Sequence, residues 1–310
     1  MLRIAVPDLV SNSYFPIIAA VEMGFFKEEG FDASVDLLFP IPKTFEALRD
    51  GQLDFVVGSA HATLLAFPEW QGAKLLAACG QHTYWFLVIR SDLKPQRGDL
   101  SIVKGLRIGA APGVNLSLQR MLVESGIDPE KNHVQIMPIP GAAGPNVSFG
   151  LSAAKALEEG KLDGFWANGM GCEVAVRRGV GTMVLDVRRG DGPTAARHYT
   201  FSALVTTDKT IKDSPAAARA AIRAMMQAHK ALKQDPNRAT AVGQKRFPPS
   251  EAELIAELVR RDLPYYDPTI PPEKVESMNR FAQDIGLLKA PAAYERVVAT
   301  EFSHMWNEAV

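Results

Sequence analysis

The sequence has 310 residues, and its 34 Lys and Arg against 35 Asp and Glu give a formal net charge of −1. Such a chain has no strong field to attract nucleic acid or an anionic membrane, so we expect no nucleic-acid partner. Its two cysteines, Cys79 and Cys172, lie far apart without a CxxC pair, and we expect neither a disulfide framework nor a metal site. We also expect no cofactor, because neither glycine-rich phosphate-binding motif is present.

The first part of the chain alternates short apolar runs with helical patterns. In chain order we expect a strand over 2–6, a helix over 15–28, a strand over 33–39, a helix over 44–49, a strand over 53–58, a helix over 62–67, and strands over 75–78 and 84–89. This alternation predicts a parallel sheet with helices packed on it.

A second unit of the same kind is indicated by an internal likeness. Segment 46–55 resembles segment 155–164, with Ala, Leu, Gly, Leu and Asp in the same register. The second copy follows a predicted strand over 106–110, a helix over 113–125 and a strand over 134–139. We therefore expect two related α/β units with a ligand crevice between them, since open α/β sheets bind ligands at the carboxyl ends of their strands.

The last part of the chain is mostly helical. We expect a helix over 173–178, strands over 182–186 and 199–206, and then helices over 215–233, 236–244, 250–261, 272–285 and 292–305. Ser250 and Glu253 have the spacing of a capping box. Because these helices bring no strand of their own, they should complete the first lobe. The predicted lobes are 1–89 plus 206–310 and 90–205, joined by a two-strand hinge.

Three stretches carry a resemblance to a known family: residues 14–31, residues 46–59, and residues 104–109 followed by Pro112 and Gly113. They resemble the solute-binding proteins of ABC importers in the alkanesulfonate, taurine, nitrate and thiamine-pyrimidine-precursor branch. The resemblance implies a type II periplasmic-binding-protein fold, a ligand clamped between lobes and delivery to a membrane permease. It does not imply catalysis. The same superfamily includes cytosolic enzymes, such as thiamine pyrimidine synthase, whose cysteine-rich motif this sequence lacks.

Most candidate ligand-binding residues lie in loops after predicted strands, because the helices that follow direct unpaired N–H groups toward a ligand. The others, His82, Tyr84, Trp85 and Tyr199, lead into the two predicted hinge strands. In the first lobe the candidates are Ser11, Asn12, Ser13, Tyr14, Ser59, His61, His82, Tyr84 and Trp85. In the second lobe they are Gly113, Asn115, Ser117, Trp166, Asn168 and Tyr199. The same residue types equally suit helix capping and core packing.

The loops over 9–14, 58–62, 111–117 and 166–171 contain no Arg or Lys. This favours a neutral or monoanionic ligand, with aromatic compounds, sulfonates and carboxylates as options. We expect a monomer that binds a small organic solute by hinge closure for an ABC permease. One alternative is a cytosolic enzyme acting on a small ring compound, with His61 or His82 as general base. Another is a regulatory sensor of the same fold.

Location depends on the natural start of the chain. The sequence opens on a strand-like run rather than an export signal, so the cytoplasm is one alternative. If a signal has been removed, we expect the periplasm.

Overall fold

The computed structural model describes residues 1–142 and 148–308. The chain divides into two compact units, which are Met1–His82 with Thr200–Val310 (unit 1) and Thr83–Tyr199 (unit 2). The chain passes between the units after residues 82 and 199, earlier than the predicted boundaries after residues 89 and 205. The reason is that the strand over 86–90 pairs only with strands of unit 2, and the strand over 202–207 only with strands of unit 1.

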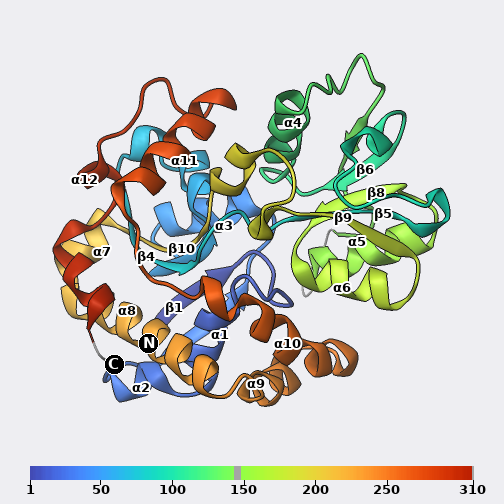
Figure 1. Ribbon diagram of the computed structural model, residues 1–310. Coiled ribbons are helices and arrows are strands. Elements are labelled where there is room, and N and C mark those ends of the chain that lie inside the picture. Colours follow the sequence, from blue (N-terminus) through green and yellow to red (C-terminus); the bar gives the residue numbers. More distant parts are fainter. Residues whose placement is uncertain (143–147, 309–310) are drawn as a thin grey trace. The chain divides into compact units, whose positions relative to one another are not determined.

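Unit 1 is built on a five-stranded sheet (Figure 1). Its strands are β1 Leu2–Val6, β2 Ala33–Leu37, β3 Phe55–Ser59, β4 Ala73–Gly80 and β10 Ser202–Thr207. They lie in the order β2-β1-β3-β10-β4, and β10 is antiparallel to both of its neighbours. β1, β3 and β4 therefore all end at the same edge of the sheet, where β10 begins.

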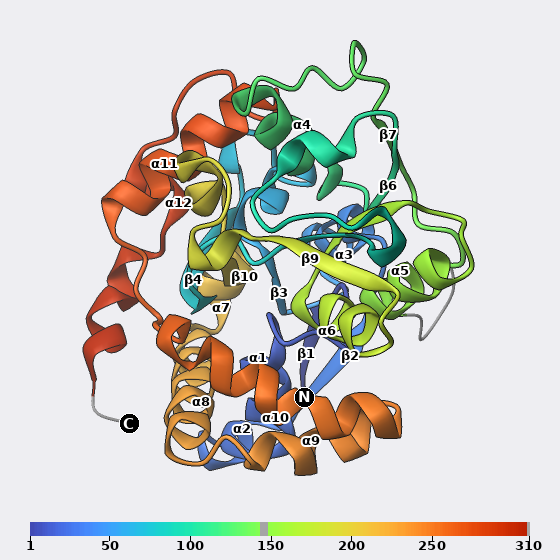
Figure 2. The same cartoon turned by 45° about the vertical axis from the view of Figure 1, so that its right-hand side comes forward.

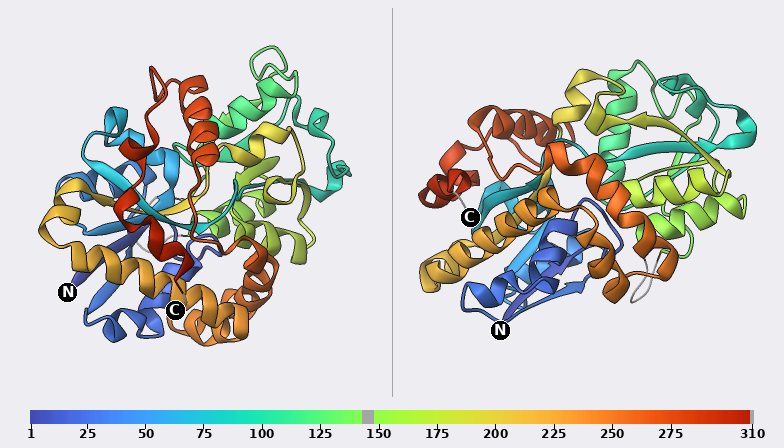
Figure 3. Two further views of the ribbon diagram at one scale, coloured as in Figure 1. Left: turned by 60° about the vertical axis from the view of Figure 1, so that its left-hand side comes forward. Right: turned by 60° about the horizontal axis from the view of Figure 1, so that its bottom comes forward.

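The helices of unit 1 pack on this sheet or on one another (Figure 2). They are α1 Phe15–Glu22, α2 Phe25–Glu28, α3 Ile41–Arg49, α7 Asp208–Asp213, α8 Pro215–Gln234, α9 Arg238–Arg246, α10 Pro249–Asp262, α11 Pro272–Asp284 and α12 Tyr294–Val297. The long α8 packs on α1 and α2 through a face rich in alanine and methionine (Figure 3). Among the described residues, none of the helices is long and apolar enough to cross a membrane.

Unit 2 repeats the arrangement. Its strands are β5 Phe86–Arg90, β6 Arg107–Ala110, β7 Gln135–Met137, β8 Gly164–Ala167 and β9 Gly181–Asp186, and its helices are α4 Asn115–Glu124, α5 Phe149–Glu158 and α6 Gly169–Arg177. The order β7-β6-β8-β5-β9 matches that of unit 1 strand for strand, with β5 in the antiparallel place of β10. The internal likeness in the sequence thus reflects two units of one topology.

Several predicted helices differ from the observed ones. The helix expected over 15–28 is broken at Gly24, whose φ of 86° lies in the left-handed region that interrupts a helix. The segment after β3 is a short 3₁₀ helix, Ala60–Leu65, and the last predicted helix is α12 followed by a 3₁₀ segment, Thr300–Asn307.

The expected capping box is also wrong. Helix α10 begins at Pro249, with Pro248 as its N-cap, so Ser250 lies inside the first turn. The Ser250 hydroxyl donates instead to Glu251, at 2.7 Å. Proline suits this first turn because its missing N–H would have no helical partner there.

An Arg–Asp clamp closes the amino-terminal edge of both sheets. In unit 2, the backbone N–H and Nε of Arg107 donate to Asp163 Oδ2 at 3.0 and 2.9 Å, and Nη2 donates to the Gly160 carbonyl at 2.9 Å. In unit 1, Arg3 makes the same three bonds, to Asp54 at 2.7 and 3.5 Å and to the Gly51 carbonyl at 2.9 Å. The Gly and Asp that recur in the sequence thus accept hydrogen bonds from an arginine on another strand. This arginine is Arg3 on β1 in unit 1 and Arg107 on β6 in unit 2.

The clamp fixes the register of β1 and β3 in unit 1 and of β6 and β8 in unit 2. Asp163 N donates back to the Arg107 carbonyl, at 2.9 Å, which joins the residue before β8 to β6. The hydrogen bonds from Arg107 lower the pKa of Asp163 from 3.8 to about 2. Because its carboxylate is charged in the folded state, the clamp contributes to stability above the ordinary carboxyl pKa.

We predict that Asp163→Asn lowers the free energy of unfolding by roughly 2 kcal/mol at pH 7, as expected for a carboxyl whose pKa is about two units below normal. The folded pKa is depressed, so this contribution is complete above about pH 4 and is lost as the pH falls toward 2. Urea unfolding of wild type and variant at pH 7 and pH 3 measures both effects. The exposed Asp213→Asn is the control, and an equal loss at the two pH values would contradict the prediction.

Candidate functional site

In unit 1 the candidate residues gather at the edge where β1, β3 and β4 end. Ser202, at the start of β10, pairs with Ser59 at the end of β3 and with Gly80 at the end of β4. The loop of residues 7–14 follows β1 at the same edge. Strand direction therefore brings Ser59, His61, His82 and this loop to one edge of unit 1, as the sequence analysis expected.

The 7–14 loop is held by its own side chains. Asp8 Oδ1 accepts from the Val10 N–H at 3.0 Å, and Ser11 Oγ accepts from the Ser13 N–H at 3.2 Å. Asn12 Nδ2 donates to Asp262 Oδ2, at the end of α10, at 2.6 Å. Ser11 and Asn12 thus shape the loop, and the carboxylate fixes which end of the Asn12 amide faces it.

Two polar atoms of this loop are buried without a partner among the described residues. Asn12 and Ser13 are each only 2% exposed, and Asn12 Oδ1 and Ser13 Oγ have no hydrogen-bond partner among the residues that the structure describes. A buried polar atom left in this way costs about 1–3 kcal/mol. Both precede α1, whose N-cap, Tyr14, makes no side-chain capping bond. The pair is therefore well suited to bind a ligand at the start of a helix.

His61 is positioned by neighbours that the sequence analysis did not single out as ligands. Its Nδ1 lies 3.0 Å from Thr200 Oγ1, and its ring packs edge-on against Phe281 with centroids 5.2 Å apart. Ser59 and His61 are both 1% exposed. The imidazole is thus a fixed, buried group at this edge rather than a mobile surface side chain.

His82 has a different setting. Its φ of 64° is in the left-handed region, and its ring lies edge-on to Tyr265 with centroids 5.9 Å apart. It is the last residue of unit 1 before the chain crosses to unit 2. The two predicted histidines therefore lie at one edge but follow different strands, with His61 on the 3₁₀ segment after β3 and His82 after β4.

In unit 2 the candidate aromatic residues form one cluster. Tyr84, Trp85 and Trp166 are nearly fully buried, and the ring centroids of Trp85 lie 5.4 Å from Tyr84 and 6.0 Å from Trp166. Trp166 Nε1 donates to Ser117 Oγ at 2.9 Å, and Ser117 Oγ donates to the Val114 carbonyl at 2.6 Å. Ser117 thus orients Trp166 and uses its hydroxyl in doing so.

The other predicted residues of unit 2 have structural partners. Asn115 Oδ1 accepts from the Gly113 N–H at 2.9 Å, and Asn168 Oδ1 accepts from the Gly171 N–H at 3.1 Å as the N-cap of α6. Tyr199 donates its hydroxyl to Glu124 at 2.6 Å. These bonds define the loops at the strand ends, and a direct role for these side chains in binding stays a prediction.

Arg188 is a buried charge that the sequence analysis missed. It follows the end of β9 at Asp186, is 2% exposed, and its guanidinium carbon lies 5.5 Å from the centroid of the Tyr84 ring. β9 ends at the same edge as β8, because both are antiparallel to β5. Arg188 could have been predicted from the sequence by considering the residues that follow β9, as was done for other strands. A cation at this edge favours an anionic ligand.

Comparison with known proteins gives a family and a fold. The sequence model described as NMT1/THI5 like matches residues 11–239, whereas no curated protein gives a significant sequence match. A protein of Bordetella bronchiseptica RB50 superposes with a TM-score of 0.78 at 19% identity, over 99% of this chain and 96% of that one.

Two further solved structures have assigned ligands. The alkanesulfonate-binding protein SsuA from Xanthomonas axonopodis pv. citri, bound to MOPS, has a TM-score of 0.67 at 15% identity over 97% and 96% of the two chains. A mutant of DSZB in complex with biphenyl-2-sulfinic acid has a TM-score of 0.67 at 15% identity over 98% of each. Together with the family match, they show that the chain has the type II periplasmic-binding-protein fold and belongs to the NMT1/THI5-like family.

Proposed function

We propose that this protein binds a small organic monoanion that also carries a hydrogen-bond donor, and that both units contribute to binding. The observation that carries the proposal is the pair of buried atoms Asn12 Oδ1 and Ser13 Oγ, without partners among the described residues at the start of α1. A ligand that bonded to both would remove the cost of burying them.

The two atoms require different ligand groups. Asn12 presents an acceptor, because its Nδ2 donates to the Asp262 carboxylate. Ser13 can donate its hydroxyl proton to an anionic oxygen, and the first turn of α1 favours negative charge beside it. A hydroxy- or amino-substituted sulfonate, sulfinate or carboxylate meets both requirements.

Unit 2 supports the same ligand class. Arg188 supplies a buried positive charge, and the rings of Tyr84, Trp85 and Trp166 supply flat apolar surface beside it. Guanidinium groups bind carboxylates and related oxyanions by paired hydrogen bonds. The ligand we propose therefore has an apolar or aromatic body as well as its charged group.

The solved structures of the same fold agree with this class, since one is an alkanesulfonate-binding protein and another is in complex with a sulfinic acid. We extend the proposal to closure of the two units on the ligand, delivery to an ABC permease and a periplasmic location, following the named roles of the sulfonate-binding proteins. A panel of sulfonates, sulfinates and carboxylates, screened by the rise in melting temperature, would identify a ligand for the tests below.

Ser13→Ala should weaken binding of that ligand about tenfold, because it removes one hydrogen bond to a charged group. The same change should leave the melting temperature of the empty protein equal or slightly higher, since the Ser13 hydroxyl has no partner among the described residues. Isothermal titration calorimetry and thermal unfolding measure the two effects.

The control for this change is Ser277→Ala, on α11, where the hydroxyl bonds only to the Glu273 carbonyl among the described contacts. Its affinity should equal that of wild type. Unchanged affinity in Ser13→Ala would remove the main support for the proposed site.

Arg188→Met should reduce the preference for a charged ligand. We expect the ratio of affinities for a sulfonate and its neutral sulfonamide to fall about tenfold or more, because the cation that distinguishes the two is gone. Measuring a ratio separates this effect from any general loss of packing around Tyr84. A ratio equal to that of wild type would show that Arg188 does not contact the anionic group.

Enzymatic activity is the second candidate function. It is favoured by the buried His61, held by Thr200, and by the likeness to the desulfurization enzyme DSZB. Solute binding predicts that a bound sulfinate or sulfonate is recovered chemically unchanged after long incubation, as measured by mass spectrometry. Conversion that is lost in His61→Gln would instead establish catalysis, with His61 in the reacting centre.

A further inference from the structure

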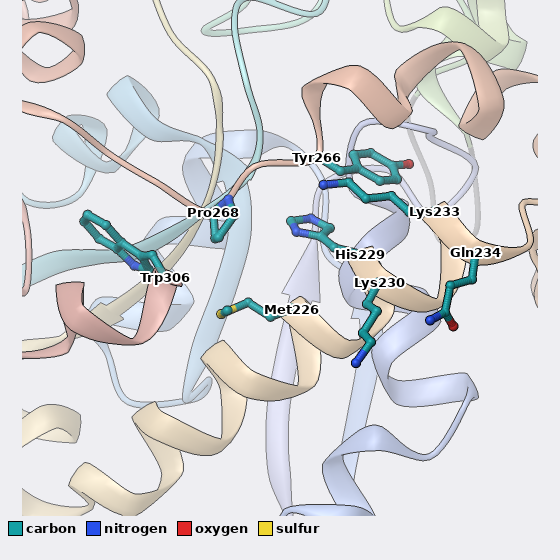
Figure 4. A pocket seen from close by; sticks show the side chains of 8 residues that line it. All are labelled: Met226, His229, Lys230, Lys233, Gln234, Tyr266, Pro268 and Trp306. Atoms are coloured by element: carbon teal, nitrogen blue, oxygen red, sulfur yellow. The ribbon is translucent and has the colours of Figure 1, made fainter. Parts of the chain in front are cut away.

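A cavity lies in unit 1, on the outer side of β4. It has a volume of about 320 Å³, at the lower end of the range for small-molecule pockets, and all its lining residues belong to unit 1 (Figure 4). The walls come from α8, from the segment after Tyr265 and from the 3₁₀ segment Thr300–Asn307. The residues that matter below are His229, Lys230, Lys233, Tyr266, Pro268 and Trp306.

Three of these residues bond to the free edge of the sheet, which β4 forms as an edge strand. His229 Nε2 lies 2.8 Å from the Cys79 carbonyl, Trp306 Nε1 donates to the Leu76 carbonyl at 2.9 Å, and the Pro268 carbonyl accepts from the Ala78 N–H at 2.9 Å. The cavity is thus bounded by side chains held in fixed positions by backbone bonds.

His229 presents an unused acceptor. Since a carbonyl can only accept, Nε2 carries the hydrogen, and burial lowers the pKa of His229 from 6.5 to about 4, so the ring is neutral at pH 7. Nδ1 then has a lone pair, and it has no partner among the described residues, although His229 is only 3% exposed. The imidazole stacks on the Tyr266 ring, with centroids 5.0 Å apart and planes at 15°.

Positive charge lies beside this acceptor. Lys230 and Lys233 are exposed residues of α8 that line the cavity, and the charge of Lys233 is close enough to lower the pKa of His229. Figure 4 shows the Lys233 side chain reaching back along the imidazole toward Tyr266, whereas Lys230 and Gln234 extend away from it. An occupant would therefore meet a cation and a neutral acceptor at neighbouring positions.

We propose that this cavity is a second binding site, for a small aromatic anion that also carries a hydrogen-bond donor, such as a hydroxybenzoate. The carboxylate would lie at Lys233, the hydroxyl would donate to His229 Nδ1, and the ring would pack against the apolar surface of Pro268 and Trp306. The proposal is independent of the function proposed above, because it uses none of the same residues.

A ligand bound in this cavity should stabilise the hydrogen bonds at the end of β4. The segment that contains Tyr266 and Pro268 also holds Gln81, whose N–H donates to the Tyr265 carbonyl at 2.8 Å and whose Nε2 donates to the Asp267 and Thr269 carbonyls at 2.7 and 2.9 Å. A ligand that immobilises this segment should slow local opening of these bonds. Slower hydrogen exchange at the Ala78 and Gln81 amides is therefore a readout specific to this cavity.

The test uses 4-hydroxybenzoate with the full chain. We expect saturable binding by calorimetry, slower exchange at the amides of Ala78 and Gln81, and binding of benzoate about fivefold weaker because it has no donor. Lys233→Gln should weaken the binding of 4-hydroxybenzoate about threefold or more. The control is Lys212→Gln, at an exposed position on α7, which should leave the affinity unchanged. Lys233 is chosen because replacing His229 would also remove the bond to Cys79 and could unfold the edge.

Three outcomes would overturn the proposal. They are no saturable binding, equal affinities in Lys233→Gln and Lys212→Gln, and binding without slower exchange at Ala78 and Gln81. Ser13→Ala separates the two sites, because it should leave the exchange effect of 4-hydroxybenzoate unchanged. If the exchange effect disappears in Ser13→Ala, 4-hydroxybenzoate acts through the site at Asn12 and Ser13, and the proposal of a second binding site is wrong.

Discussion

The Arg–Asp clamp at the amino-terminal edge of each sheet is the interaction on which the rest of the structure depends. Arg107 bonds to Asp163 and Gly160, and Arg3 bonds to Asp54 and Gly51, so β6 and β8 in unit 2 and β1 and β3 in unit 1 start in a fixed register. Because the two strands of each pair are parallel, their carboxyl ends lie at the same opposite edge of the sheet. The loops that carry the candidate ligand-binding residues emerge from that opposite edge, which is why a clamp far from the ligand residues determines where they lie.

The two units share this topology but differ in the chemistry of their strand ends. Unit 1 presents the buried oxygens of Asn12 and Ser13 beside the start of α1, and unit 2 presents Arg188 with the Tyr84, Trp85 and Trp166 rings. Repetition of a fold therefore supplies two similar scaffolds with unlike side chains at their strand ends. The ligand class that we propose, a monoanion that also carries a donor, follows from that combination.

Local sequence rules predicted the strands, the repeat and most of the candidate residues, because strand direction and loop position follow from nearby residues. Asn12 and Ser13 were found in this way. Asp262 was not, since it lies 250 residues from Asn12 and only the fold brings them together. The arginine of each clamp was also missed, because Arg3 and Arg107 lie outside the segments that repeat, and the partners of Ser117 and Asn168 could not be told from ligand contacts by residue type alone.

The central claim is that one small anion is bound by residues of both units, and small-angle X-ray scattering tests it most directly. A ligand that raises the melting temperature should lower the radius of gyration of the wild-type protein, and Ser13→Ala and Arg188→Met should each require more ligand for the same change. A radius of gyration that stays constant at saturating ligand would contradict the claim.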